Sequence, residues 1–395
     1  MTIKFAFIQI ITLTTVVNGY VGAGAQITAD KEICNINNNS VITANILQDQ
    51  RELIAKEIQS LEGEREFENL NSLTPENNGS PFRSVIVTTW RSGSTFLGEI
   101  LNSMPGNYHH FEPLVNYGIR VVRGPPDDER AIYQLQQLLH CNYLNLSEYV
   151  NFGAKHKFVY NYNARLWKYC YLHPGHPNKT QIQTHPDDPR YCSNASFLSS
   201  FCKLFPLQSM KVLRLRLALT EQLLEDPSLN VRIVFLVRDP RGLMLSRKSC
   251  KWCHGEADCE NPSTVCNDML FDYFSAKSFQ IKYPLRFKVV RYEELSLDPF
   301  KVTEEILKFY GLPFDEMVKT YLESHTKQHI GNIYSTFRNS SLTPFRWMHN
   351  LTYKEIEDIQ TDCTKAMELY GYKKMEEKDF NNVTEFNPLL QWRLE

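Results

Sequence analysis

Arg91 and Gly93 lie in a polar turn whose residue types favour binding of an anion. The segment reads "VIVTTWRSGSTFLGEIL" over residues 85–101, so an apolar β-branched run precedes the turn and a helical pattern follows it. A strand, a turn and a helix in this order hold anions, because the first N–H groups of the helix lack intrahelical partners and its dipole favours negative charge. The P-loop pattern GxxxxGK(S/T) is absent, since no lysine follows Gly93. The turn therefore predicts an anion site that differs from a P-loop for ATP.

A second group of phosphate-binding side chains follows the strand-like run "VRIVFLV", residues 231–237. Arg238 stands at the end of that run, and Ser246 lies eight residues later, within a predicted helix. With this spacing a guanidinium and a hydroxyl can hold one phosphate from two sides, and the arginine contact can be bidentate. Asp239 could cap the helix or orient an arginine. An ordinary turn with a surface ion pair is the alternative interpretation.

The stretch "YHHFEPL", residues 108–114, supplies candidate bases for a hydroxyl proton at the predicted end of another strand. Glu112 lies 21 residues beyond Arg91 and can reach it across adjacent strand ends. Partial burial would raise the pKa of this carboxyl toward a useful value. His110 is the alternative base, with His109 as a further candidate. At least one of the two histidines is expected instead to pack on aromatic rings.

The elements that must position these loops follow an α/β pattern. Strand-like apolar runs occupy residues 84–88, 210–213, 231–237 and 287–292, and helical stretches separate them. Apolar β-branched strands that alternate with helices predict a mainly parallel sheet covered on both faces. Ligands of such sheets bind at the carboxyl ends of the strands, where both polar turns are expected.

By composition, the 395 residues divide into a targeting segment, a stem and one large domain. Residues 1–25 hold Lys4 and a thirteen-residue apolar core, which predict either a cleaved signal peptide or a signal anchor. Residues 26–80 are expected to form a stem whose helical segment is solvated or forms a short coiled coil. Residues 81–395 are expected to form the catalytic domain, with an irregular cysteine-rich insertion over about residues 120–205.

Cysteine content and sequons indicate the secretory pathway. Ten cysteines are an even number, as an oxidising compartment allows. Eight N-x-S/T sequons occur, at Asn38, Asn78, Asn145, Asn178, Asn194, Asn339, Asn350 and Asn382. Cys250, Cys253, Cys259 and Cys266 raise the alternative of a zinc site, but their spacing departs from paired C-x2-C and the compartment favours disulfides. The formal net charge of −2 disfavours a nucleic-acid partner bound through overall charge.

Two of these motifs resemble the donor-binding elements of one enzyme family. "WRSGSTF" resembles the 5′-phosphosulfate loop of Golgi carbohydrate sulfotransferases, and "VRDPRGLMLSR" resembles their 3′-phosphate element. The stretches "FEPL", "VVRYEEL", "STFRNSS", "RWM" and "CTKAMELYGY" extend the similarity over roughly residues 85–373, with weak correspondence over residues 120–205. The chain is most similar in these motifs to the galactose/N-acetylgalactosamine/N-acetylglucosamine 6-O-sulfotransferases.

This resemblance implies a PAPS-dependent sulfotransferase fold, a P-loop-like parallel sheet flanked by helices. The co-substrate would be 3′-phosphoadenosine 5′-phosphosulfate (PAPS), and no metal would be needed. Arg91 would stabilise charge on the leaving phosphate, while Arg238 and Ser246 would hold the 3′-phosphate. The resemblance favours Glu112 over His110 as the base. The implied donor-binding residues are Trp90, Arg91, Ser92, Gly93, Ser94, Thr95, Phe96, Arg238, Asp239, Ser246 and Arg338. Within this set the two aromatic residues would fix the loop by packing. The implied acceptor-binding residues are Lys211, Arg346 and Trp347.

The implied reaction is transfer of sulfate from PAPS to the 6-hydroxyl of N-acetylglucosamine, galactose or N-acetylgalactosamine in a glycan or glycosaminoglycan. Sulfotransferases of 2-O, 3-O, 4-O or tyrosyl specificity and a non-catalytic glycan-binding relative are alternatives. A nucleotide kinase is disfavoured, because the P-loop lysine is absent. The resemblance further implies a single-pass type II Golgi membrane protein with a lumenal domain, or a secreted protein if the leader is cleaved. The stem is a candidate contact for a homodimer.

Overall fold

The computed structural model describes residues 23–61, 67, 69–156, 158–170 and 191–394. The chain divides into two units, residues 1–46 and residues 47–395. Most of the predicted targeting segment lies outside the described residues, which begin within helix α1, Ala23–Ile58. Among the helices of the described ranges, none is long and apolar enough to cross a membrane.

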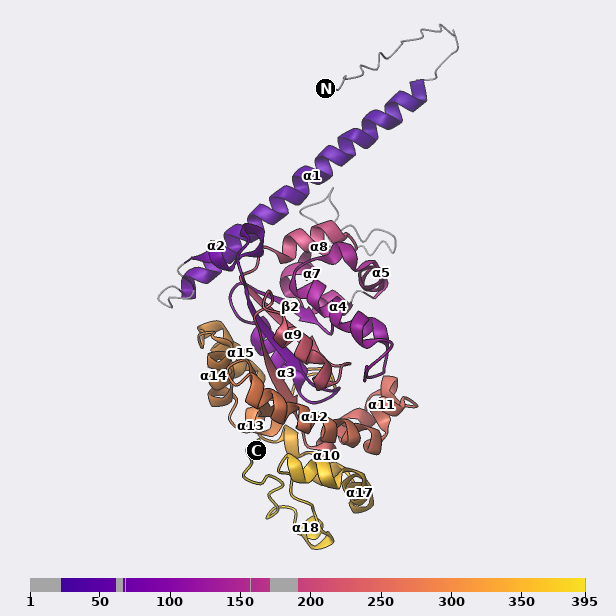
Figure 1. Cartoon of the computed structure of the whole chain (residues 1–395), viewed down its shortest axis with the longest axis vertical. Coiled ribbons are helices and arrows are strands. Elements are labelled where there is room, and N and C mark those ends of the chain that lie inside the picture. Colours follow the sequence, from indigo (N-terminus) through magenta and orange to yellow (C-terminus); the bar gives the residue numbers. More distant parts are fainter. Residues whose placement is uncertain (1–22, 62–66, 68, 157, 171–190, 395) are drawn as a thin grey trace, which may run out of the picture. The chain divides into compact units, whose positions relative to one another are not determined.

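A five-stranded parallel sheet forms the centre of the second unit (Figure 1). Its strands lie in the order β2-β3-β1-β4-β5. They span Phe82–Val87 (β1), Asn107–Phe111 (β2), Leu207–Val212 (β3), Val231–Val237 (β4) and Phe287–Arg291 (β5). Each pair runs parallel, so all carboxyl ends meet at one edge. The predicted α/β class and parallel sheet are confirmed.

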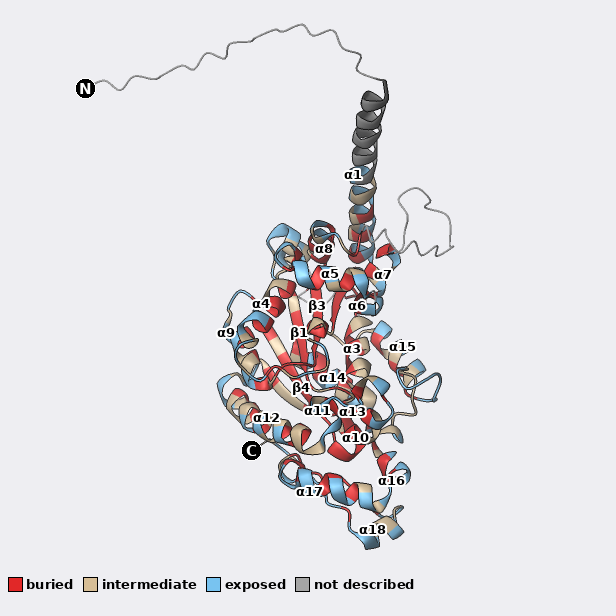
Figure 2. Cartoon of the chain, turned by 90° about the vertical axis from the view of Figure 1, so that its right-hand side faces the viewer, coloured by how far each residue is buried: buried red, intermediate tan, exposed pale blue. Residues whose placement is uncertain are grey.

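Helices cover both faces of this sheet, whose strands are almost entirely buried (Figure 2). Helix α3 contacts β1, β2 and β3, whereas α9 contacts β4 and α12 contacts β5. Because both faces of these strands are covered, their Val, Ile and Leu residues form continuous apolar runs in the sequence. The helices after α1 are α2 (Leu70–Leu73), α3 (Ser94–Asn102), α4 (Asp128–Leu139), α5 (Ser147–Lys155), α6 (Phe158–Asn161), α7 (Ala164–Cys170), α8 (Ala195–Cys202), α9 (Glu221–Glu225), α10 (Pro240–Lys248), α11 (Ala257–Glu260), α12 (Pro262–Lys282), α13 (Tyr292–Leu297), α14 (Pro299–Tyr310), α15 (Glu316–His325), α16 (Trp347–Asn350), α17 (Tyr353–Leu369) and α18 (Glu377–Asn381).

The described part of the insertion at residues 120–205 is helical rather than irregular, since it carries α4 to α8. Disulfides Cys141–Cys202 and Cys170–Cys192 lie in this region, and Cys253–Cys259 and Cys266–Cys363 lie beyond it. Three of the four cysteines weighed as zinc ligands therefore lie in two disulfides, and the fourth, Cys250, is a buried thiol. Within the described ranges, no group of three His, Cys, Asp or Glu side chains could hold a metal ion.

The end of α1 packs within the second unit. Ile54 and Ile58 are buried, and Glu57 pairs with Arg165 of α7 at 2.5 Å. The carboxylate of Glu57 also accepts a hydrogen bond from the backbone N–H of Gly106 at 2.9 Å. Residues 47–61, which the sequence places in the stem, thus contribute apolar side chains to the core of the compact unit.

Candidate active site

The loop after β1 is held in a fixed conformation by its own hydroxyls. The Thr88 hydroxyl donates to the carbonyl of Leu236 on β4 at 2.6 Å, and the Ser92 hydroxyl donates to the Thr89 carbonyl at 2.9 Å. Gly93 has φ of 90°, and a Cβ there would lie 2.1 Å from the ring of Tyr292. Only glycine therefore fits this position. Because glycine has no side chain to cap α3, the first N–H groups of that helix are presented to the loop.

The predicted donor residues Arg91, Arg238 and Ser246 converge. The Arg91 Nε donates to the Ser246 hydroxyl at 3.0 Å, and an Arg238 Nη donates to the Arg91 carbonyl at 2.7 Å. The convergence follows from topology, because β1 and β4 are neighbours and their carboxyl ends carry Arg91 and Arg238. Arg91 adopts a φ of 68°, a left-handed conformation that is uncommon for a residue with a side chain.

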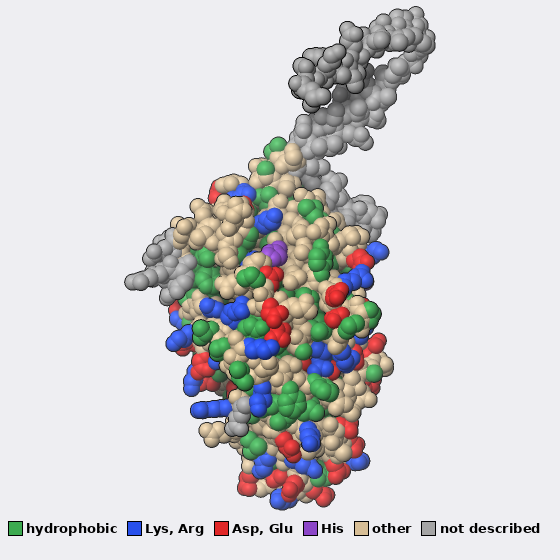
Figure 3. Space-filling model, in the orientation of Figure 1, with side chains coloured by type: hydrophobic (Ala, Val, Ile, Leu, Met, Phe, Trp, Pro, Cys, Tyr) green, Lys and Arg blue, Asp and Glu red, His purple; other side chains and the backbone are tan. Residues whose placement is uncertain are grey.

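A later segment brings further positive charge to the same loop. Arg91 donates to the carbonyl of Ile333 at 2.7 Å, and Arg338 donates to the carbonyl of Asn332 at 2.5 Å. Burial lowers the pKa of Arg338, and the nearby charges of Arg346 and Arg91 lower it further. Neighbouring positive charges repel one another, and a bound anion reduces that repulsion. Acidic and basic side chains are interspersed on the face of the molecule shown in Figure 3.

Asp239 serves the framework of the loop. Its carboxylate accepts from the backbone N–H of Arg241 at 2.9 Å and pairs with the Arg241 guanidinium at 2.7 Å, and both residues are buried. Asp239 thus caps α10 and also orients Arg241, which are the two roles considered from the sequence. Burial raises the pKa of the adjacent Glu293 to about 7, and the Asp239 charge adds to that rise. Asp239 therefore positions α10 rather than reaching a ligand.

Glu112 lies at the end of β2, bound by two buried cations. Lys211 lies 3.3 Å from one carboxylate oxygen, and Arg214 lies 2.8 Å from the other. Burial raises the pKa of Glu112, but the two cations outweigh burial and hold the pKa below its usual value. The expectation of a raised pKa was therefore wrong. Strand β3 lies between β1 and β2, so Glu112 and Arg91 are not on adjacent strands as predicted. Instead Lys211 of β3 links Glu112 to Thr95, whose hydroxyl is 3.3 Å from the ammonium.

The structure removes both histidines from the list of candidate bases. His110 is buried against Tyr108 with ring centroids 4.9 Å apart, and its Nδ1 lies 3.5 Å from the Tyr143 hydroxyl. Burial, with a contribution from the charge of Arg83, lowers its pKa to about 3. His109 points to the opposite face of the strand and bonds Ser209 at 2.8 Å. The aromatic packing alternative holds for His110, whose ring packs on Tyr108.

The predicted acceptor platform on Trp347 is also corrected. Trp347 is 0% exposed, and the guanidinium carbon of Arg241 lies 3.9 Å from the centre of its ring. A sugar cannot stack on an indole that is covered on all sides. Arg346 is exposed beside this tryptophan. Trp90 is likewise buried, packing with Leu213 and the Cys253–Cys259 loop, as expected for a residue that fixes the donor loop.

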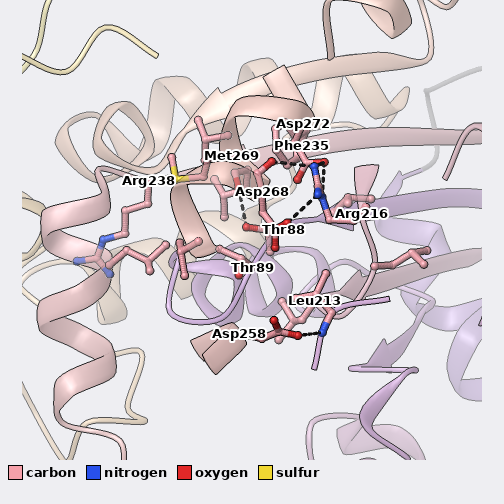
Figure 4. Close-up of a pocket in the computed structure, with 17 residues that line it drawn as sticks. Thr88, Thr89, Leu213, Arg216, Phe235, Arg238, Asp258, Asp268, Met269 and Asp272 are labelled. Atoms are coloured by element: carbon pink, nitrogen blue, oxygen red, sulfur yellow. Dashed lines mark hydrogen bonds and ion pairs between the residues drawn. The ribbon is translucent and has the colours of Figure 1, made fainter. Parts of the chain in front are cut away.

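A pocket lies beside the loop, between the strand ends and α12 (Figure 4). Its polar groups bind one another, since Arg216 pairs with Asp268 at 2.7 Å and with Asp272 at 2.9 Å. Burial raises the pKa of Asp272 to about 6, although Arg216 opposes the rise. Figure 4 shows the Arg238 guanidinium directed away from these carboxylates. Among the described residues, its Nε has no hydrogen-bond partner, so it retains a donor for a ligand at the loop.

Arg247 is a structural anchor of the loop that sequence reasoning assigned no role. It is 1% exposed and donates to the carbonyls of Trp90 at 3.1 Å and Cys259 at 2.9 Å. It also donates to the Thr89 hydroxyl at 2.7 Å. Burial lowers the pKa of this guanidinium to about 9. The arginine therefore joins the donor loop to the disulfide-closed segment after α10. Its place one residue after Ser246 was the only signal in the sequence.

Replacing Arg247 with methionine is expected to destabilise the fold by about 2 kcal/mol, because buried carbonyls lose their donors. The measurement is the free energy of unfolding by denaturant titration. The matched control is Lys248→Met, the next residue of α10, whose side chain is 62% exposed and pairs with Glu355 at the surface. The control should change stability by no more than about 0.5 kcal/mol. Equal effects in the two variants would contradict the anchoring role.

The fold and site define a class first: an α/β protein in which arginines gather at the loop after β1 and the P-loop lysine is absent. Residues 81–371 match the family described as Sulfotransferase domain, and the chain belongs to that family, which confirms the family predicted from the motifs. It is 28% identical over 329 residues to mouse carbohydrate sulfotransferase 1, covering 73% of this chain and 79% of the relative. It is 26% identical over 379 residues to carbohydrate sulfotransferase 3 of Tetronarce californica, covering 85% and 84%. A sulfotransferase domain from a Synechococcus olefin synthase aligns with a TM-score of 0.39 and 16% identity, covering 73% of this chain and 94% of that chain.

Proposed function

We propose that this protein transfers a sulfuryl group from PAPS to the 6-hydroxyl of a neutral sugar in a glycan. The observation that carries the proposal is the convergence of Arg91, Arg238 and Ser246 at the neighbouring ends of β1 and β4. Arg91, Arg238 and Arg338 gather at one loop, and none of the hydrogen bonds described above joins them to a carboxylate. Such a site suits a ligand with two separate phosphate groups. The relatives named carbohydrate sulfotransferase support a sugar as the acceptor.

In the proposed mechanism, the acceptor oxygen forms a bond to sulfur while the bond from sulfur to the phosphate oxygen breaks. The Arg91 guanidinium and the N-terminus of α3 stabilise the charge that grows on the leaving phosphate. Glu112 takes the proton of the acceptor hydroxyl, and 3′-phosphoadenosine 5′-phosphate leaves. Lys211 contacts both Thr95 of the loop and Glu112, so a donor anion that draws Lys211 toward the loop raises the basicity of the carboxylate.

Ser246→Ala is expected to raise the Michaelis constant for PAPS about tenfold while changing kcat less, since it removes one hydrogen bond to a group remote from the reacting atoms. Initial rates at varied PAPS concentration provide the measurement. Ser275→Ala, on an exposed turn of α12, serves as the matched serine control. An unchanged constant in Ser246→Ala would count against its assignment to the 3′-phosphate.

The proposed location is the Golgi lumen, with the N-terminal segment as a membrane anchor or a cleaved leader and the stem as a possible dimer contact. Four described disulfides suit an oxidising lumen. Sequon asparagines exposed in the structure are Asn78, Asn145, Asn194, Asn350 and Asn382. Exposed sequons are open to glycosylation, which supports passage through the secretory pathway.

The test is transfer of labelled sulfate from PAPS by the full chain, made in a secretory host. Acceptors would be glycans ending in N-acetylglucosamine, keratan-type chains and chondroitin-type chains. Mass spectrometry of the labelled product would locate the sulfate on the sugar ring. Label at a 6-position supports the proposal, label at another position assigns a different regiochemistry, and no label on any glycan overturns the proposed acceptor class.

A further inference from the structure

Tyr162, between α6 and α7, places an aromatic ring beside Glu112. Its ring stacks on Phe111 with centroids 3.9 Å apart and an interplanar angle of 12°. Phe111 is the last residue of β2 and directly precedes Glu112. The ammonium of Lys211 lies 3.8 Å from the Phe111 ring. The two rings therefore form a layered support whose inner ring is buried and whose outer ring, Tyr162, is half-buried.

The backbone around Tyr162 is fixed, so the ring does not depend on a ligand for its position. Asn102 of α3 donates to the Tyr162 carbonyl at 2.8 Å. The neighbouring Asn163 donates to the carbonyl of His109 at 3.2 Å and accepts from the backbone N–H of Leu166 at 3.1 Å. These bonds join the α6–α7 link to β2 and α3. A preorganised flat ring costs little conformational entropy when a ligand binds against it.

The ring also lies close to a charged group of the site, since the ammonium of Lys211 is 5.9 Å from its centre. Burial raises the pKa of the Tyr162 hydroxyl, the charges of Glu99 and Glu112 raise it further, and the charge of Arg91 lowers it. Glu99 lies one turn beyond Thr95 on α3, where burial raises its pKa to about 7. Thus Tyr162 stands near the cation that handles the donor and near the carboxylate that serves as the base.

We propose that Tyr162 is the platform on which the acceptor sugar stacks, and that this subsite takes an uncharged hexose ring. The inference rests on the proposed function and replaces the platform predicted on Trp347. A tyrosine face binds the apolar C–H face of a sugar through dispersion and its quadrupole. Lys211 and Arg214 already bind Glu112, so neither is free to bind a carboxylate on the sugar.

Tyr162→Leu tests the platform, because leucine still covers Phe111 but has no flat face. The Michaelis constant for the glycan acceptor is expected to rise about tenfold, with the constant for PAPS unchanged. Tyr162→Phe should recover most of that loss, since it restores the ring. The matched control is Tyr133→Leu, a tyrosine that is 45% exposed and lies on α4, a helix that carries none of the residues argued here. Thermal melting of each variant checks that folding is intact.

Assays with two different acceptors distinguish failure of this inference from failure of the proposed function. Wild-type protein would be assayed with a neutral keratan-type chain and with a chain desulfated to expose the 2-hydroxyl of uronic acid. Transfer to the neutral chain with a tenfold loss in Tyr162→Leu supports the platform. Normal transfer with equal acceptor constants in Tyr162→Leu and wild type overturns the platform alone. Preferential transfer to uronic acid overturns both the platform and the proposed acceptor.

Discussion

Replacing Arg91 with alanine should lower kcat for sulfuryl transfer by about 10³-fold or more. A cation placed on a leaving phosphate acts mainly in the transition state, and removing such a group from related phosphoryl-transfer sites costs 10³–10⁵. The fold should survive, because the Arg91 side chain is only partly buried and its partners are a serine hydroxyl and one loop carbonyl. The measurement is single-turnover transfer from labelled PAPS, which isolates the chemical step from product release.

The matched control for Arg91 is Arg130→Ala. Arg130 is a surface arginine, with a side chain 59% exposed, and it pairs with Glu148. Its removal should leave transfer within about twofold of wild type, since exposed ion pairs contribute little. Undiminished transfer by Arg91→Ala, with folding checked by melting temperature, would remove this arginine from the proposed mechanism.

The second large effect is expected for Glu112→Gln, which should lower kcat by about 10²–10⁴ if this carboxylate is the base. Glutamine keeps an oxygen that can accept from one of the two buried cations, but it cannot take up the acceptor proton. Breaking a buried charge pair costs about 3–5 kcal/mol, so rates must be compared per folded molecule. The amount of folded protein is obtained from donor binding measured on the same sample. Near-normal kcat would shift suspicion to Glu99, the other carboxylate close to Lys211.

The pH dependence separates these two carboxylates. Lys211 and Arg214 hold the pKa of Glu112 below 4.5, whereas burial raises that of Glu99 to about 7. The acid limb of kcat/KM reports the base of the free enzyme, so it should lie below pH 4.5 for Glu112 and near pH 7 for Glu99. The same sign holds for stability: because the folded pKa of Glu112 is lowered, its stabilisation is complete above pH 4.5 and is lost as pH falls through the folded value.

Local patterns in the sequence were sufficient for the elements that carry the site. The strand runs before Thr88 and Arg238 are apolar and β-branched, and each ends in a polar turn, so both loops and their order could be predicted. Glu112 was also placed at a strand end, although the strand before it, Asn107–Phe111, has no apolar β-branched run. Parallel sheets then bring all such ends to one edge, which made convergence of the donor residues predictable.

The features that escaped prediction depend on pairing between distant segments. Strand β3, nearly 100 residues beyond β2, inserts between β2 and β1 and carries the lysine that lowers the pKa of Glu112. No local period reveals such an insertion. Trp347 looked available for stacking because its cover, Arg241, lies more than 100 positions earlier. Tyr162 lies in the insertion where correspondence to the family was weakest, so only the folded chain placed its ring on Phe111.

The most direct test of the central claim is a calorimetric comparison of two nucleotides that differ only in the 3′-phosphate. The claim is that Arg238 and Ser246 hold a 3′-phosphate while the loop at Arg91 holds the 5′ group. The account predicts that 3′-phosphoadenosine 5′-phosphate binds at least about 100-fold more tightly than adenosine 5′-phosphate, a difference of about 2.7 kcal/mol. It also predicts that Arg238→Ala removes most of this difference. Equal affinities for the two nucleotides, or no binding of the 3′-phosphorylated one, would contradict it.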